Sequence, residues 1–398
     1  MMHKAGKRYS NYDRGFLPSL WNSAVITGML LGTFGIWLAI LGNPENSGIC
    51  ISCFLENIAG ALHLHSNMRM SYLRPEIIGL VIGSFLIALM GGRFRVKGGS
   101  SPLIRFVMGF YLMVGASMFI GCPVKSGLRL SAGDLTAVPA ILGFVAGVWF
   151  GLQYLRGGFA LEKEKELGKA NGLVIPGLMA TLLLFLFLRP AFIALGTKGP
   201  AAMHAPIWIS LLAGITIGGF AQRSAFCMMA GFRNFFIARD WFLLKGIVTM
   251  FLVALGLALL TGHFRLGLNG QPGSHLAHGW SFLGMFLVGG ISVMANGCPF
   301  RQVVMAGEGN TDAGLTLLGM LVGGGIVQSW EIRSTIAGPT FSGEIAVLTG
   351  LIFLLAIGIA FRTRKIRIQK IQVAQEEQLA VSRLNTSSDH QSNLQVLF

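Results

Sequence analysis

The chain has 398 residues, of which 53% are hydrophobic and only 12% are charged, whereas a soluble globular protein carries about 25% charged residues. This composition excludes an ordinary soluble domain and predicts a polytopic membrane protein. The formal net charge of +15 does not indicate nucleic-acid binding, because the basic residues fall between the apolar runs and form no single basic face.

Several apolar runs exceed the roughly 18 residues that a transmembrane helix needs. We predict an all-α fold with about ten spans, near residues 21–42, 75–92, 104–120, 136–155, 172–190, 206–222, 243–262, 279–296, 312–330 and 344–361. Four further segments are too short or too polar to cross, and we expect them to be re-entrant or interfacial helices. They lie near residues 48–64, 123–133, 224–238 and 299–309.

The orientation follows from lysine and arginine, which concentrate in cytoplasmic loops. If the short segments return to the side they entered from, one side holds 23 of the 31 basic residues and the other holds 8. The basic side includes the N-terminal region 1–20, so both termini are predicted to be cytoplasmic, and no cleavable signal peptide is evident. The polar tail 369–398 is predicted to be disordered, and its last letters, SNLQVLF, resemble a protease-site remnant.

The chain contains an internal repeat, which decides the fold. Gly121-Cys122-Pro123 recurs 176 residues later as Gly297-Cys298-Pro299, and SGICISCFLEN at 47–57 matches SAFCMMAGFRN at 224–234 at an offset of 177. Each copy, 21–190 and 206–361, holds five spans. Five is odd, so the second copy starts from the opposite side and the two repeats are predicted to be inverted. Inverted repeats are typical of transporters whose site lies at the repeat interface.

All five cysteines fall in or at the start of the short segments, and none lies in an ordinary span. They are Cys50, Cys53, Cys122, Cys227 and Cys298. A free cysteine is usually a small buried hydrophobic residue, but that role would scatter cysteines among the spans. Their clustering, with Cys50 matching Cys227 and Cys122 matching Cys298, favours a functional role.

The Gly-Cys-Pro motifs predict a turn between a full span and a short helix. The span is expected to end at Gly121 or Gly297, where φ is free, and Pro123 or Pro299 then begins the short helix. The cysteine falls at the helix cap, beside free N–H groups that attract anions.

A cation follows each of these prolines by two residues, Lys125 in the first half and Arg301 in the second. A cation in the first turn opposes the helix dipole, which favours a role in binding an anion. The alternative is a side chain that snorkels to the membrane interface. Together these features predict a narrow central passage lined by thiols and backbone amides, suited to a soft anion containing sulphur or selenium.

Two further pairs of polar residues are equivalent in the repeats. Glu56 and Arg233 either form an ion pair across the symmetry axis or face solvent at their own rims. Asn57 and Asn234 are predicted to cap or cross-link the short segments. The loop histidines are weak evidence for a metal, and neither a metal nor another cofactor is predicted.

The paired Gly-Cys-Pro motifs and the inverted duplication resemble the YeeE/YedE family of sulphur-transport membrane proteins. The stretches NGCPFRQ…AGEGNTDAG at 296–314 and QRSAFCMMAGFRN at 222–234 are most similar to the YedE branch, which is linked to selenium transport. The resemblance covers about residues 20–362. It implies uptake of a small sulphur or selenium species, such as thiosulfate, across a bacterial inner membrane.

The resemblance also implies residue roles and a partner. Cys122 and Cys298, by the motif, and Cys227 and Cys50, by repeat position, would pass the anion along a constricted path. Cys53 departs from the symmetry, because its repeat counterpart is Ala230. A small soluble sulphur carrier of the SirA/TusA type would meet the cytoplasmic face.

Two other functions compete with uptake by a membrane transporter. Cys50-Ile51-Ser52-Cys53 has the Cys-x-x-Cys spacing of thiol–disulfide chemistry, so a membrane oxidoreductase is one alternative. A passive anion channel is the other, because no buried proton relay or sodium site is evident in the sequence. No ATP-binding P-loop occurs, and we do not expect the chain to be an enzyme.

Overall fold

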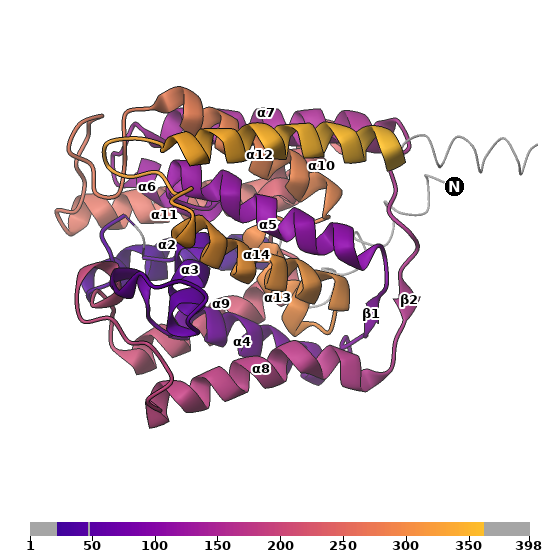
Figure 1. Ribbon diagram of the computed structural model, residues 1–398, viewed down its shortest axis with the longest axis horizontal. Helices are drawn as coiled ribbons and strands as arrows, with labels where there is room; N and C mark the ends of the chain where they lie inside the picture. Colours follow the sequence, from indigo (N-terminus) through magenta and orange to yellow (C-terminus); the bar gives the residue numbers. More distant parts are fainter. Residues whose placement is uncertain (1–21, 47, 362–398) are drawn as a thin grey trace, which may run out of the picture.

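The computed structural model describes residues 22–46 and 48–361, and a helix lies at each of the ten predicted spans (Figure 1). The predictions for the N-terminal region 1–20 and for the tail 369–398 lie outside the described residues. The ten helices are α2 (Ser23–Ile40), α4 (Pro75–Met90), α5 (Pro102–Phe119), α7 (Ala137–Arg156), α8 (Lys169–Leu188), α9 (Ile207–Ser224), α11 (Phe242–Leu260), α12 (His278–Met294), α14 (Thr311–Ser329) and the helix Phe341–Phe361.

Seven helices in the described part of the chain are long and apolar enough to cross a membrane. Two of the seven run on into a short helix, so they extend over Pro102–Ser131 and His278–Gly307. Of the other long helices, α4 is shorter, and α9 and α14 are less apolar. The chain is therefore a multi-pass membrane protein, and the total of ten spans stays a prediction.

The four short segments are helices, α3 (Ile51–Ala61), α6 (Pro123–Ser131), α10 (Met228–Ala238) and α13 (Pro299–Gly307). They have 9 to 11 residues, which gives lengths of about 14 to 17 Å. A hydrocarbon core is about 30 Å thick, so none of the four can cross it alone.

The long helices pack in pairs at very short range: α2 against α11, α4 against α9, α5 against α14 and α7 against α12. Glycine makes this approach possible. A Cβ built on Gly28 of α2 would overlap the carbonyl oxygen of Gly246 in α11, and one on Gly147 of α7 would overlap that of Phe286 in α12. Each pair joins a helix of the segment 21–190 to one of the segment 206–361.

A small antiparallel sheet joins two loops at one end of the bundle. Strand β1 (Lys97–Gly98) pairs with β2 (Lys165–Glu166), and Figure 1 shows both beside each other at the end opposite α6. The remaining elements are two 3₁₀ turns, η2 (Met68–Met70) and η3 (Gly199–Ala201). The strands were not predicted from the sequence, because two-residue pairings leave no periodic pattern.

Candidate functional site

Four of the five cysteines occupy the N-cap of the four short helices. Cys50 caps α3, Cys122 caps α6, Cys227 caps α10 and Cys298 caps α13, each in extended backbone geometry. Cys53 lies one turn into α3. The four N-cap residues are at most 2% exposed, so the thiols lie inside the protein and beside the free N–H groups of four helices.

The short helices meet N-terminus to N-terminus in two groups. In the first thiol group, made of Cys50, Cys53 and Cys122, the side chain of Cys122 interacts with that of Cys50 and with the backbone N–H of Ile51. Cys50 Sγ and Cys53 Sγ are 2.9 Å apart. All three are free thiols.

The second thiol group consists of Cys227 and Cys298, whose sulphur atoms are 3.5 Å apart. The backbone N–H of Cys298 donates to Cys227 Sγ at 3.5 Å, and the N–H of Met228 approaches the thiol of Cys298. Ile51 and Met228 are 177 positions apart, the same offset that relates Cys50 to Cys227. Both groups therefore use the same contact, in which the thiol of Gly-Cys-Pro meets the first N–H of the neighbouring short helix.

Lys125 adds a buried cation to the first thiol group. The residue is 2% exposed, and Nζ donates to the carbonyl oxygen of Ile120 at 2.7 Å and to Cys53 Sγ at 3.8 Å. No carboxylate of the described residues lies within 4.0 Å of its Nζ. Lys125 is thus an ammonium ion without a counter-charge, at the meeting point of two helix N-termini, and this setting favours an anion.

Arg301, the repeat counterpart of Lys125, has a different environment. Its NH1 forms an ion pair with Glu308 Oε1 at 2.9 Å and donates to the carbonyl oxygen of Ala221 at 3.4 Å. Glu308 follows α13 and neutralises the cation locally. The two halves therefore place a cation at the same position, but only the first leaves it unpaired.

The structure corrects the prediction for the glycine of Gly-Cys-Pro. The residue with positive φ is the one before it, Ile120 at 58° and Asn296 at 59°. Gly121 is required for space instead, because a Cβ there would lie 2.7 Å from Cδ of Lys125. A β-branched residue in the left-handed region is strained, and Ile120 turns its carbonyl oxygen toward Lys125.

Pro123 and Pro299 begin α6 and α13, as predicted from their fixed φ. At Gly297 a Cβ would lie 3.1 Å from Nε2 of Gln302, a side chain that donates to the carbonyl oxygen of Ala295 at 3.0 Å. In both halves a side chain thus folds back over the motif's glycine to reach a carbonyl at the end of the preceding helix.

Glu56 and Arg233 do not contact each other within the described structure. Glu56 is 2% exposed, accepts a hydrogen bond from Gln328 Nε2 at 2.9 Å and lies 3.7 Å from Arg333 NH1. Arg233 donates to Asn296 Oδ1 at 3.0 Å. Neither expected arrangement describes Glu56, since its carboxylate is buried and its charge partner is Arg333.

Of the two asparagines at equivalent positions, Asn57 cross-links its short helix and, within the described residues, Asn234 does not. Asn57 donates to the carbonyl oxygen of Met70 at 2.7 Å and accepts from Arg74 Nε at 2.7 Å. Asn234 accepts from Arg233 Nε at 3.2 Å. Asn57 thus ties α3 to the loop before α4, whereas Asn234 contacts its own neighbour in α10.

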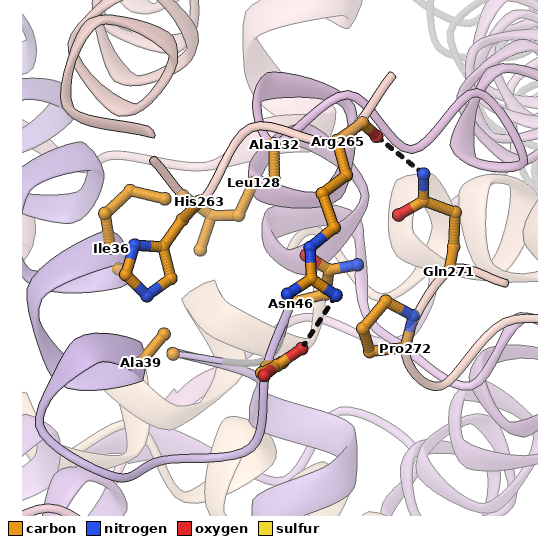
Figure 2. A pocket seen from close by; sticks show the side chains of 12 residues that line it. Ile36, Ala39, Asn46, Leu128, Ala132, His263, Arg265, Gln271 and Pro272 are labelled. Atoms are coloured by element: carbon orange, nitrogen blue, oxygen red, sulfur yellow. Dashed lines mark hydrogen bonds and ion pairs between the residues drawn. The ribbon is translucent and has the colours of Figure 1, made fainter. Parts of the chain in front are cut away.

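A small cavity of about 40 Å³ is lined by the loop that precedes Cys50 and by the end of α6. Gly48, two residues before Cys50, and Leu128 of α6 line it, together with polar side chains from the loop after α11. Figure 2 shows Arg265, His263 and Gln271 around this cavity. Arg265 forms an exposed ion pair with Glu45 at 3.9 Å.

A second cavity of about 200 Å³ is lined in part by the end of α12, which precedes Cys298. Asn296, two residues before Cys298, lines it with Arg105 and Ser100. Leu155 lines this cavity at the last turn of α7, whereas Ala132 lines the first cavity just before α7 begins. The 20 residues of α7 span about 30 Å, so the cavities lie at opposite ends of that helix.

Three buried arginines were missed by the sequence analysis, which treated them as loop charges. Arg74 donates to the carbonyl oxygens of Pro200 and Met203 at 2.7 and 3.0 Å. Arg129 pairs with Asp134 at 2.6 Å, and Arg105 donates to the carbonyl oxygen of Ala295 at 2.9 Å. The proximity of Arg129 to Asp134 in the sequence was a usable signal, whereas Pro200, Met203 and Ala295 lie more than 100 positions from the arginines that bond them.

Two of the loop histidines form hydrogen bonds with backbone groups. Nε2 of His65 lies 3.0 Å from the carbonyl oxygen of Glu56. Nε2 of His275 lies 2.6 Å from the carbonyl oxygen of Met118. Nδ1 of His275 accepts from the N–H of Ala277 at 3.2 Å, so its Nε2 is the donor. Burial lowers the pKa of the His275 imidazole, which keeps the ring neutral in this role.

Residues 223–394 match the model of a family described as "Sulphur transport". The match includes the second thiol group and supports the resemblance to the YeeE/YedE family. A comparison with curated proteins gives no match.

Proposed function

We propose that the chain takes up a small sulphur- or selenium-containing anion across a membrane. The proposal is supported by the match of residues 223–394 to the sulphur-transport family model and by the helices of a multi-pass membrane protein. The observation that carries the proposal is the buried, unpaired ammonium of Lys125 beside the thiols that cap α3 and α6. An unpaired buried charge is costly, so a site that keeps one is best explained by a ligand of opposite charge.

The chemistry of the two thiol groups selects a soft anion. Each group offers helix N-termini, which favour negative charge, and sulphur atoms, which are polarizable weak donors. An anion with terminal sulphur or selenium can accept S–H hydrogen bonds from successive thiols. In this proposal it enters by one cavity, passes both thiol groups and leaves by the other cavity.

The helix contacts support the proposal of two inverted repeats, 21–190 and 206–361. At the 176-residue offset, α5 corresponds to α12 and α7 corresponds to α14. The repeat therefore predicts that a contact between α7 and α12 is matched by one between α14 and α5. Both contacts are present. The exchange also relates the contact of α4 with α13 to that of α11 with α6. A pseudo-twofold axis accounts for both equivalences.

The cellular setting is part of the proposal. The excess of lysine and arginine supports cytoplasmic termini, and the resemblance favours a bacterial inner membrane, the YedE branch and a SirA/TusA-type carrier on the cytoplasmic face. The first cavity, with Arg265, would then face outward and the second would face the cytoplasm.

A thiol–disulfide oxidoreductase is the second candidate, because Cys50 Sγ and Cys53 Sγ lie only 2.9 Å apart. At this distance the two thiols of the Cys-x-x-Cys could be oxidised to a disulfide and reduced again. The repeat argues against it, since the second half has Ala230 in place of Cys53.

Flux into liposomes containing the purified protein tests the proposal. Thiosulfate, selenosulfate and sulfate are supplied outside, and internal anion is measured over time. We expect uptake of thiosulfate or of the selenium anion in preference to sulfate, which lacks a soft terminal atom. Absence of uptake of every sulphur and selenium anion would reject the transport function.

A further inference from the structure

We infer that the buried carboxyl group of Glu56, one turn after Cys53 on α3, binds and releases a proton that is transported together with the anion. The inference rests on the proposed function and adds to it a source of energy. Glu56 lies on the same short helix as two thiols of the first group. No role in binding the anion is needed for it, because its own charge would repel one.

The surroundings of Glu56 allow it to exist with and without a proton. Glu56 is 2% exposed, and burial of a charged carboxylate is unfavourable unless the carboxylate is paired. Its charge partner, Arg333, stands 3.7 Å away with a side chain that is 23% exposed. Gln328 donates to the same carboxylate oxygen at 2.9 Å, and an amide can bond either protonation state through its N–H or its carbonyl oxygen.

The other titratable groups near Glu56 belong to the loops and to the first thiol group. His65 holds the backbone carbonyl of Glu56 and not the carboxylate. Cys53 lies three residues before it, at the spacing that makes side chains neighbours on a helix, and Lys125 contacts Cys53 Sγ at 3.8 Å. Together with Arg333, these are the groups that act on the carboxylate or on its neighbour.

The position of Glu56 provides the coupling. An anion held at Lys125 places negative charge near the carboxylate and favours its protonation. By reciprocity, a proton on Glu56 removes a like charge and strengthens anion binding. Proton and anion thus bind the first thiol group cooperatively, which is the requirement for moving them together.

The side chains that contact the Glu56 carboxylate, Gln328 and Arg333, extend to the surface of the protein. Gln328 accepts from Asn67 Nδ2 at 3.0 Å through a contact at the surface, and Arg333 is partly exposed. A proton on Glu56 also favours uptake, since a dianion that enters alone moves two negative charges against an inside-negative potential. Each proton that enters with it reduces the net charge moved by one.

The test uses the full-length protein in liposomes, with the membrane potential held at zero by valinomycin and equal potassium. Thiosulfate is the probe, because it does not itself bind a proton near neutral pH. With the outside more acidic by about one pH unit, one proton per anion accumulates thiosulfate about tenfold inside. An internal pH dye is expected to report acidification of the lumen in step with uptake.

The variants Glu56→Gln and Glu76→Gln separate the carboxyl group from a general effect on folding. Glu56→Gln keeps the shape and the contact with Gln328, so we expect downhill uptake to continue while accumulation falls from about tenfold to about onefold. Glu76→Gln is the matched control, because Glu76 is also 2% exposed and bonds Asn43 at 2.8 Å. It is expected to accumulate thiosulfate as the parent protein does.

Each outcome decides between the two proposals. Tenfold accumulation by Glu56→Gln overturns the role of Glu56. If Glu56→Gln does not fold, the parent protein decides, because uptake of thiosulfate without acidification of the lumen would overturn the inference. If the inference is correct, Glu56→Asp, which keeps a carboxyl group, should still accumulate thiosulfate. A parent protein that takes up no thiosulfate at any pH gradient rejects the proposed function itself.

Discussion

Replacing Lys125 with methionine removes the positive charge beside the first thiol group, while keeping an unbranched side chain of similar length. The ammonium is 2% exposed and lies 3.8 Å from Cys53 Sγ, so an anion seated among these thiols bonds it directly. A hydrogen bond to a charged group contributes about 1.5 to 3 kcal/mol. We therefore expect the half-saturating anion concentration to rise about 10- to 150-fold.

The same substitution has an unusual effect on stability. Lys125 loses its bond to the carbonyl oxygen of Ile120, 2.7 Å in length, but the cost of burying an unpaired ammonium also disappears. We expect the melting temperature in detergent to stay within a few degrees of that of the parent protein, or to rise. Loss of transport without loss of stability is the signature of a ligand-binding cation.

Arg301→Met provides the matched control at the repeat-related position. It breaks the ion pair of Arg301 with Glu308, 2.9 Å long, and leaves that carboxylate partly buried without a partner, so the melting temperature should fall. The assays are concentration-dependent uptake into liposomes and thermal unfolding in detergent. An unchanged half-saturating concentration for Lys125→Met, or a sharp fall in its melting temperature, would refute the reasoning.

Three further predictions follow from contacts in the described structure. Gly121→Ala places a Cβ 2.7 Å from Cδ of Lys125 and should therefore displace the ammonium and weaken uptake as Lys125→Met does; normal uptake kinetics would contradict this. Cys53→Ala should retain measurable uptake, because four capping thiols remain, whereas complete loss of activity together with loss of thiol–disulfide exchange would favour the oxidoreductase. Arg74→Met leaves the carbonyl oxygens of Pro200 and Met203 without their hydrogen-bond donor and should destabilise the protein by about 3 kcal/mol. Thermal unfolding measures the effect, and an unchanged melting temperature would show that these hydrogen bonds are not stabilising.

Local sequence signals predicted most of the fold because they depend on neighbouring residues. Apolar runs, proline at a helix start and free backbone groups at a helix end are properties of a few consecutive residues. The four short helices and the placement of Cys122 and Cys298 at N-caps followed from them. The turn itself was predicted less well, since the positive φ falls on Ile120 and Asn296 and the glycine makes room for a side chain.

The charge partners could not be predicted in the same way. Glu56 pairs with Arg333, which lies 277 positions further along the chain, and Arg233 bonds Asn296. The repeat suggested that residues at equivalent positions have equivalent surroundings. Lys125 and Arg301 show that the inference fails for charges, because a single extra carboxylate, Glu308, changes the electrostatics of one half only.

By itself the sequence determined that the protein lies in a membrane and that its cysteines gather on four short helices, and its offsets predicted a duplicated chain. These conclusions rest on composition, on offsets and on local helix chemistry, none of which needs a distance across the fold. Only the tertiary structure decided which buried charges are neutralised and which thiols meet, because both depend on side chains brought together from distant helices. The unpaired ammonium of Lys125 beside Cys53 is the product of that packing.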